Sequence, residues 1–591
     1  MLNPLLLVSA AFFAPPPPSR AFIYVDPTDS DTFDARFETT VATCEEQGIL
    51  CISVWSKGYA TMLLNREDVR AEEAAEIRSM VAPESGDELA WAAACMPPEC
   101  TVLGSVSGSD AGTGTSERLL DALAPASRSN GLLAARRDKY EMHEALRNAE
   151  LAAAAQCVAC TWEEAAAFVA GQQTPSRRVV LKPRRGAASL RVGLATSAPE
   201  ARALFTAILA EPSSLDDDGG ATAYSVLLQE YLHDTTAGSA EWVVDTVSRG
   251  GEHKVVALWR YDKGAANGAP FVYFAIEPSG CGDSDSVSGR VASYATRVLD
   301  ALAWRWGPAH LEVMWMGDAR GPVLVEANMG RWNGEEFRLL ADVCFGVNAY
   351  DACYAALLAD DSDAAAWAEI PHTPPPALRA AAKLVKLVSY ARGPLVEVRH
   401  AEAIEELPSV LRVHYAYEDE GDLVRPTVDL NSAAGDVLLV HEDAEVVEAD
   451  YVALRAMQPT LFAVEGGVDA KGEEEEEDGK EAREDVEEVL VDSVDVDKAV
   501  EEAERRARLE ATEALRLAAA ALAEPPSCEW ATLAVRFPLV DGEFELRAAP
   551  ASAAASSAVD EPRRLGAMLL RAVRTARDEA TAIAHCEDLL K

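Results

Sequence analysis

Residues 310–331 have the sequence HLEVMWMGDARGPVLVEANMGR and carry the strongest structural signal in the chain. Two apolar segments flank a glycine-containing turn at residues 317–321, so the pattern predicts a β-hairpin. Glu312 and Glu326 lie inside the two segments, and Asn328 shares a face with Glu326 because strand side chains alternate. A carboxylate buried among apolar residues is costly unless it is paired or bound to a metal. Two carboxylates and an amide oxygen suit Mg²⁺, so the hairpin predicts a magnesium site.

Upstream of this hairpin, three segments supply the other groups that a phosphorylated nucleotide needs. Such a ligand requires cations and backbone N–H groups around its phosphates and a polar edge for its base. RRDKYEM contains Lys139, and VVLKPRRGAASLRV contains Lys182. The turn from Gly186 to Ser189 in the second segment offers N–H groups as an anion nest. LLQEYL, residues 227–232, is a strand segment with polar residues at its end.

The order of these segments, followed by EWVVD with Glu241, resembles the ATP-grasp superfamily of carboxylate–amine ligases. Within that superfamily it is similar to the carbamoyl-phosphate-synthase-like and L-amino-acid ligase branches, over about residues 21–461. The resemblance implies that ATP is bound by Lys139, Lys182, Gly186, Ser189, Gln229, Glu230, Tyr231, Leu232 and Glu241. It implies that Mg²⁺, or Mn²⁺ in its place, is bound by Glu312, Glu326 and Asn328.

The resemblance also implies two catalytic residues, Lys182 and Arg331, and it contains one departure. The family usually has an arginine two residues after the asparagine, whereas Arg331 follows Asn328 by three. This arginine is implied to stabilise the charge that develops on an acyl phosphate or a carbonyl oxygen. Either a local bulge restores its reach, or the role falls to Arg305, Arg260 or another cation.

The segment WRYDKGAANGAPFVYF, residues 259–274, is similar to the part of amino-acid-ligase-like proteins that lies near the acceptor pocket. In that interpretation Arg260 and Lys263 pair with a substrate carboxylate. The same pattern fits a solvated hairpin tip equally well, and the sequence leaves both interpretations open.

Element patterns predict an α/β and α+β protein built from several domains. Residues 21–56 alternate strand, helix and strand, with the helix stopped by Gly48, which is typical of a βα unit in a parallel sheet. Residues 136–155 predict one long helix, and residues 528–550 predict a hairpin with an Asp-Gly turn. The predicted parts are a candidate targeting leader (1–20), a Rossmann-like pre-ATP-grasp domain (21–130), a two-lobed ATP-grasp domain (131–371), a small β-rich domain (372–463), a disordered acidic linker (464–495) and a C-terminal α+β unit (496–591) of unassigned role.

The charge and the apolar segments of the chain limit the classes of binding partner that we expect. The formal net charge of -45 repels a nucleic-acid backbone, so nucleic acid is not an expected partner. No segment reaches the roughly 18 apolar residues of a membrane-spanning helix, so an integral membrane protein is not expected either. The expected partners are small-molecule substrates, with a homo-oligomer as a candidate assembly. The short apolar leader leaves cytoplasm and a plastid or secretory route both open.

These patterns lead to one main functional prediction and two alternatives. The main prediction is an enzyme that uses ATP and magnesium to activate a carboxylate as an acyl phosphate for attack by an amine, releasing ADP and phosphate. Amino-acid or dipeptide-like substrates are expected. The first alternative phosphorylates bicarbonate or carbamate as a carboxylase-like enzyme, and the second is a non-catalytic ATP-binding module.

Overall fold

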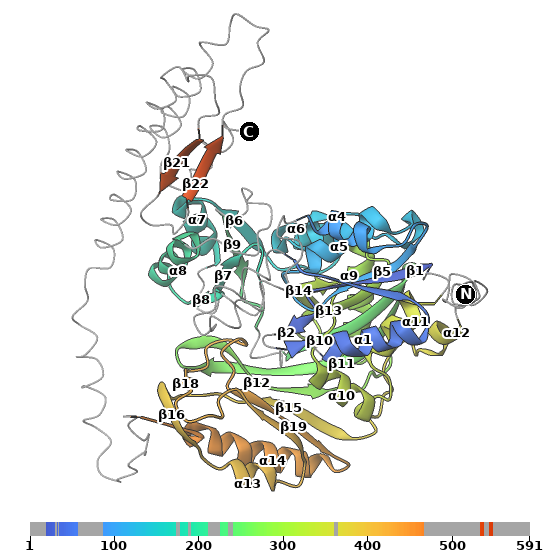
Figure 1. Cartoon of the computed structure of the whole chain (residues 1–591). Coiled ribbons are helices and arrows are strands. Elements are labelled where there is room, and N and C mark those ends of the chain that lie inside the picture. Colours follow the sequence, from blue (N-terminus) through green and yellow to red (C-terminus); the bar gives the residue numbers. More distant parts are fainter. Residues whose placement is uncertain are drawn as a thin grey trace, which may run out of the picture.

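The computed structural model describes residues 19–29, 32–33, 35–56, 87–172, 178–186, 191–210, 225–233, 240–359, 365–465, 532–536 and 543–547. In Figure 1 the N-terminal elements (blue) and a small lobe (teal) lie above the strands of one large sheet, and the elements of residues 401–457 (orange) lie at the bottom. The predicted acidic linker lies outside the described residues from residue 466 onward.

The N-terminal unit is a parallel three-stranded sheet with strand order β4-β1-β5. Its strands are β1 (Arg20–Val25), β4 (Leu50–Val54) and β5 (Thr101–Ser107), and its helices are α1 (Ala35–Glu46), α4 (Glu88–Cys95) and α5 (Thr113–Leu123). A two-residue pair, β2 (Thr28–Asp29) and β3 (Thr32–Phe33), follows β1. The predicted parallel βα unit is confirmed, and Gly48 ends its helix with a φ of +64°.

One helix prediction in the next segment is wrong in length. The expected helix at residues 136–155 is interrupted: α6 spans Lys139–Asn148, and residues 151–155 have no regular structure before the next strand. Glu150 has a φ of +57°, which a helix interior does not accept. The short helices η2 (Ala126–Arg128) and η3 (Ala134–Arg136) precede α6.

A four-stranded antiparallel sheet with order β6-β9-β7-β8 forms a small lobe. Its strands are β6 (Gln156–Ala159), β7 (Val179–Pro183), β8 (Gly193–Ala195) and β9 (Val226–Glu230). Helices α7 (Trp162–Gln172) and α8 (Ala198–Ala210) cover it and share an apolar core with the strands.

The large sheet has eight strands in the order β14-β13-β10-β11-β12-β15-β19-β17. They are β10 (Ala240–Arg249), β11 (Glu252–Ala266), β12 (Ala269–Pro278), β13 (Gly307–Trp315), β14 (Pro322–Met329), β15 (Ala381–Lys386), β17 (Val410–Tyr415) and β19 (Gly435–His441). Helix α9 (Val287–Ala301) packs on one face, while α10 (Glu335–Cys344) and α11 (Ala349–Leu357) share apolar clusters with the opposite face. The predicted hairpin of residues 310–328 is confirmed as the antiparallel pair β13–β14.

This sheet continues across the predicted boundary at residue 372, because β15, β19 and β17 extend the strands of the grasp region. The remaining elements here are α12 (Ala365–Glu369), β16 (Gly393–Val398), α13 (Ala401–Glu405), β18 (Leu423–Val424), α14 (Ala444–Met457), η4 (Gln458–Thr460) and β20 (Phe462–Val464). Near the C-terminus, β21 (Thr532–Arg536) pairs antiparallel with β22 (Glu543–Arg547), as the hairpin pattern predicts. Among the described residues, no helix has the length and apolar character to cross a bilayer.

Candidate active site

The predicted metal ligands meet at the β14 edge of the large sheet. Glu312 and Glu326 are directly opposite each other in the β13–β14 register, and His310 is opposite Asn328. A register shift follows Glu312, so one extra residue of β14 is accommodated next to the two carboxylates. The Asn328 amide donates to Glu326 Oε1 at 3.2 Å, so these two groups lie on one side of the hairpin.

Two lysines act on Glu326, Lys139 of α6 through a direct contact and Lys182 of β7 through its charge. Lys139 Nζ lies 2.9 Å from Glu326 Oε2 and donates to the carbonyl of Gly186 at 2.7 Å. Burial would raise the pKa of Glu326, but the charges of Lys139 and Lys182 lower it to about 2. Burial and the neighbouring Lys139 lower the pKa of Lys182 to about 8, against the opposing effect of the carboxylates. Helix α6 begins at Lys139, where the Asp138 side chain caps the helix, so this lysine is held at a fixed point.

Glu312 lies in a different electrostatic environment. Burial raises the pKa of Glu312 to about 7, Lys263 opposes this shift, and the charges of Glu326 and Glu241 add to it. Lys263 Nζ contacts Glu241 at 2.5 Å and Glu312 at 3.9 Å. The same ammonium lies 4.2 Å from the ring centroid of Tyr273, so a cation–π contact supports the pair. The structure therefore places Lys263 inside the site.

Next to Glu312, a buried polar network continues along the same strands. Asp245 accepts from Trp259 Nε1 at 2.7 Å and from Asn333 Nδ2 at 2.9 Å, and it lies 2.9 Å from His310 Nδ1. A proton on Nδ1 satisfies this contact, which directs His310 Nε2 towards Glu312 Oε1 at 3.9 Å. Burial would lower the pKa of His310, but the hydrogen bond and charge of Asp245 raise it. Sequence reasoning missed Asp245 and Asn333, because no local motif marks either residue.

The hinge strand β9 leads from the small lobe to the large sheet. Gln229 is buried and donates from Nε2 to Gln156 at 3.0 Å. Arg320, at the turn of the β13–β14 hairpin, pairs with Glu230 at 2.5 Å, so the Glu230 carboxylate already has a cationic partner. Tyr231 lies under Arg178, whose guanidinium is 5.9 Å from the ring centroid.

At the end of β9, some main-chain groups already form hydrogen bonds within the protein. The amide N–H of Glu230 donates to Ala155 and that of Tyr231 donates to Arg178, at 2.9 and 3.0 Å. The Leu232 side chain is buried and packs with Val323 of β14. The strand therefore ends against the same hairpin that carries the carboxylates.

Three further residues predicted to bind the nucleotide, Gly186, Ser189 and Glu241, differ in where the structure places them. The Gly186 carbonyl contacts Lys139, which places the start of the turn beside the lysines. Ser189 lies outside the described residues. Glu241 is paired with Lys263 and thus belongs to the Glu312 side of the site.

The displaced arginine is directed away from the strand by a glycine. Gly330 has a φ of +82°, a conformation that favours glycine, and turns the chain at the end of β14. Arg331 Nη1 then pairs with Asp110 of the N-terminal unit at 2.6 Å. The two alternative arginines lie elsewhere: Arg260 is exposed and pairs with Glu277, and Arg305 is exposed at the start of β13.

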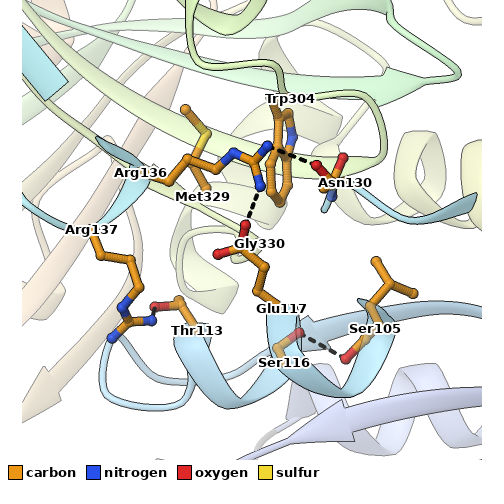
Figure 2. A pocket seen from close by; sticks show the side chains of 11 residues that line it. Ser105, Thr113, Ser116, Glu117, Asn130, Arg136, Arg137, Trp304, Met329 and Gly330 are labelled. Atoms are coloured by element: carbon orange, nitrogen blue, oxygen red, sulfur yellow. Dashed lines mark hydrogen bonds and ion pairs between the residues drawn. The ribbon is translucent and has the colours of Figure 1, made fainter. Parts of the chain in front are cut away.

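A pocket of about 500 Å³ adjoins Lys139, Glu326 and Asn328. The other lining residues come from the N-terminal unit, from η3 and α6, from the turn after β7 and from β14: Asp110, Thr113, Arg136, Arg137, Met142, Arg185, Gly186, Ala327 and Met329. A second space of about 340 Å³ adjoins it, and Figure 2 shows Arg136 between Glu117 and Asn130 there, with Arg137 directed towards Thr113. The pocket thus lies between the N-terminal unit and the carboxylates.

The donor set fits a magnesium ion bound together with phosphates. Glu312, Glu326 and Asn328 carry carboxylate and amide oxygens, the hard donors that Mg²⁺ prefers, on adjacent strands. In the described part of the chain, no three His, Cys, Asp or Glu side chains are arranged to hold a metal by themselves. Magnesium in phosphate-binding sites commonly uses one or two carboxylates plus substrate oxygens, so this set matches that pattern.

Comparison with known proteins gives structural matches only. No protein-family profile matches the chain, and no curated protein sequence matches it. Among solved structures, an L-amino acid ligase from Bacillus licheniformis is similar with a TM-score of 0.51 and 16% identity, covering 74% of this chain and 97% of the ligase. An N5-carboxyaminoimidazole ribonucleotide synthetase in complex with ADP has a TM-score of 0.49 and 13% identity, covering 75% of this chain and 98% of the synthetase.

The match to the L-amino acid ligase identifies the fold of the chain. The ligase is matched over nearly its whole length. Lys139 joins the turn after β7 to the β13–β14 hairpin, because it contacts both the Gly186 carbonyl and Glu326. The chain therefore has the fold of the ATP-grasp ligases.

Proposed function

We propose that this protein is an ATP- and magnesium-dependent ligase that joins a carboxylate to an amine. The observation that carries the proposal is the arrangement around Glu326, where buried Lys139 pairs directly with the carboxylate beside a pocket and the charge of buried Lys182 acts on the same carboxylate. Such a constellation combines positive charge for phosphates with oxygen ligands for a metal. The fold shared with an L-amino acid ligase supports amino-acid or dipeptide-like substrates.

In the proposed reaction, a carboxylate oxygen attacks the γ-phosphorus of ATP and ADP leaves. The amine then attacks the acyl carbon, inorganic phosphate leaves with the bridging oxygen, and the amine loses a proton. Lys139 and Lys182 offset the negative charge of the phosphates, and Arg331 stabilises charge on the acyl phosphate. The main chain at Leu232 is proposed to meet the adenine edge.

Glu312, Glu326 and Asn328 are proposed to hold the metal. Magnesium, when bound, neutralises charge on the phosphate oxygens and orients the γ-phosphoryl group. Glu326 is already ionised near neutral pH because its pKa is about 2, so it is ready to bind a cation. Manganese is expected to replace magnesium because it accepts the same oxygen ligands. A homo-oligomer remains a prediction.

The proposal is tested by measuring phosphate release with pairs of amino acids in the presence of Mg-ATP. Bicarbonate replaces the carboxylate substrate in one arm, and substrate-free protein measures background hydrolysis. Amine-dependent phosphate release with formation of an amide supports the ligase. Release that depends on bicarbonate alone would replace it with the carboxylase-like alternative.

A binding measurement separates an inactive nucleotide-binding module from an enzyme. Titration calorimetry compares Mg-ATP binding to the unmodified protein, to Glu326→Gln and to Glu397→Gln, whose carboxylate on β16 is 66% exposed. We expect a loss of affinity for Glu326→Gln only. Strong binding with no phosphate release for any substrate pair would contradict the ligase proposal.

A further inference from the structure

The end of β14 is joined to the N-terminal unit by a direct main-chain contact. The Ser107 N–H donates to the carbonyl of Gly330 at 2.9 Å, and the Gly330 N–H donates to Pro308 at 2.9 Å. Both polar groups of Gly330 are thus used, which fixes the turn that precedes Arg331. The loop that follows β5 therefore lies against the residue that directs this arginine.

The same loop provides the ionic partner of Arg331. Asp110 Oδ1 lies 2.6 Å from Arg331 Nη1, and the two side chains are only 26% and 21% exposed. Asp110 also lines the pocket that contains Glu326 and Asn328. The ion pair with Asp110 therefore holds the Arg331 guanidinium at the edge of the proposed substrate pocket. Asp110 belongs to the N-terminal unit and lies outside the large sheet.

The loop is itself held by a buried network. Ser109 Oγ donates to Asp26 Oδ2 at 2.5 Å, and the Gly112 N–H donates to Ser109 Oγ at 2.9 Å. Asp26 is fully buried. A Cβ on Gly112 would lie 2.1 Å from Asp26 Oδ2, so the loop closes tightly around this aspartate. The network presents Asp110 from a fixed position.

We infer that Asp110 is a positioning residue that sets the Arg331 guanidinium for the proposed reaction. The inference rests on the proposed ligase function. Arg331 follows Asn328 by three residues, and the turn at Gly330 carries it out of the strand. An anchor outside the strand gives the guanidinium a defined position in spite of this extra residue. The N-terminal unit then contributes to the chemical step as well as to the pocket wall.

A double-mutant cycle tests this role. Asp110→Asn keeps the size of the side chain and removes its charge, and it is compared with Arg331→Gln and with the double variant. We expect Asp110→Asn to lower kcat by roughly 10- to 100-fold, because a misplaced catalytic group costs this much, with KM for ATP unchanged. Arg331→Gln lowers kcat by about 100- to 1000-fold. In the Arg331→Gln background, Asp110→Asn should have no further effect.

The control cycle uses Asp318→Asn and Arg290→Gln, an aspartate–arginine pair at 3.0 Å whose aspartate is 93% exposed, and neither residue lines the pocket. Neither control change should alter kcat. Equal, additive effects of Asp110→Asn with and without Arg331 would overturn the positioning role and leave Asp110 as a structural residue. An increase of kcat in Asp110→Asn would overturn it as well, because the pair would then restrain the arginine.

A second measurement does not depend on turnover. Phenylglyoxal modification of Arg331, followed by mass spectrometry of its peptide, reports how well the guanidinium is held. We expect several-fold faster modification in Asp110→Asn than in the unmodified protein, with Arg290 unchanged. If the unmodified protein shows no turnover, the ligase proposal fails while this measurement still tests the contact. Equal modification rates would overturn the inference.

Discussion

Glu326 and Glu312 face each other across one strand pair, yet the protein shifts their pKa values in opposite directions. Lys139 and Lys182 lower the pKa of Glu326 to about 2, whereas burial raises that of Glu312 to about 7. The two pKa values differ because the cations near each carboxylate differ. Lys263 lies closest to Glu241, at 2.5 Å, and is 3.9 Å from Glu312. The surroundings of Glu326, which contain Lys139 and Lys182 and are called the lysine-rich side, suit the negative charge of phosphates. The surroundings of Glu312, called the Glu312 side, are stabilised when a cation binds together with the nucleotide.

The largest effect is expected where the Glu312 side loses its own cation. Lys263→Met leaves Glu241 buried without a partner, and breaking such a pair costs about 3–5 kcal/mol in the free energy of unfolding. Lys383→Met is the control, because Lys383 is equally buried but one of its partners, Glu448, is 59% exposed. Urea unfolding measures both variants. Equal destabilisation would contradict a special role of Lys263.

Removing the carboxylate on the lysine-rich side should weaken nucleotide binding strongly. Glu326→Gln removes a proposed magnesium ligand and the partner of Lys139 together. We expect Mg-ATP affinity to fall by about 10- to 100-fold, while affinity for metal-free ATP changes less. Calorimetry with and without magnesium measures the two constants. An equal loss in both conditions would mean that Glu326 acts only by holding Lys139.

In the nucleotide-free protein, replacing each carboxylate by an amide should change the free energy of unfolding in opposite directions. A depressed pKa means that ionised Glu326 stabilises the fold above the ordinary pKa of 4.5, and this stabilisation is lost as pH falls towards 2. A raised pKa means that Glu312 costs stability once pH exceeds 4.5, and the cost is complete above about 7. Near pH 8, Glu326→Gln should lower the free energy of unfolding and Glu312→Gln should raise it, by roughly 1–3 kcal/mol each. Thermal melting checks the signs, and shifts of the same sign would contradict the comparison.

Nucleotide binding should begin to weaken at a lower pH than it would if Lys182 had the ordinary pKa of a lysine. Lys182 has a pKa of about 8, so it loses its charge as pH rises through this value. We expect the Kd for Mg-ATP to rise by up to about tenfold per pH unit above 8. Lys182→Arg keeps its charge at these pH values and should remove the alkaline rise. A rise that persists in this variant would point to another group.

The smallest effect is expected at the hinge. Arg320 and Glu230 are 35% and 22% exposed, so their ion pair contributes at most about 1 kcal/mol. Arg320→Gln should therefore change ATP affinity only a few-fold, through a looser end of β9. Calorimetry compares this variant with Arg290→Gln on α9, whose ionic partner Asp318 is 93% exposed. A loss as large as that of Glu326→Gln would show that Arg320 contacts the nucleotide directly.

The sequence predicts the hairpin and its carboxylates because both depend on local periodicity. Glu312 and Glu326 interrupt apolar strands, and this conflict is visible without knowledge of the fold. The parallel βα unit at the N-terminus is predictable for the same reason. The helix at residues 136–155 was extended too far, because its alanines favour a helix whereas packing ends α6 at Asn148.

Contacts between distant segments are not predictable from this sequence. Asp110 lies 221 residues before Arg331, and its loop lacks any known nucleotide-binding spacing. The sequence proposes Lys263 together with Arg260, but Arg260 is exposed and pairs with Glu277, whereas Lys263, three residues further along β11, pairs with Glu241 inside the site. Glu230 is paired with Arg320 across two lobes, which no local pattern indicates.

The most direct test of the proposed chemistry follows one oxygen atom. A carboxylate substrate labelled with heavy oxygen is incubated with Mg-ATP, the amine and the protein, and the inorganic phosphate is analysed by mass spectrometry. An acyl-phosphate pathway transfers one carboxylate oxygen to phosphate for each amide formed, and the account predicts this transfer. Amide formation with unlabelled phosphate would contradict it, because the carboxylate would not have attacked the γ-phosphorus.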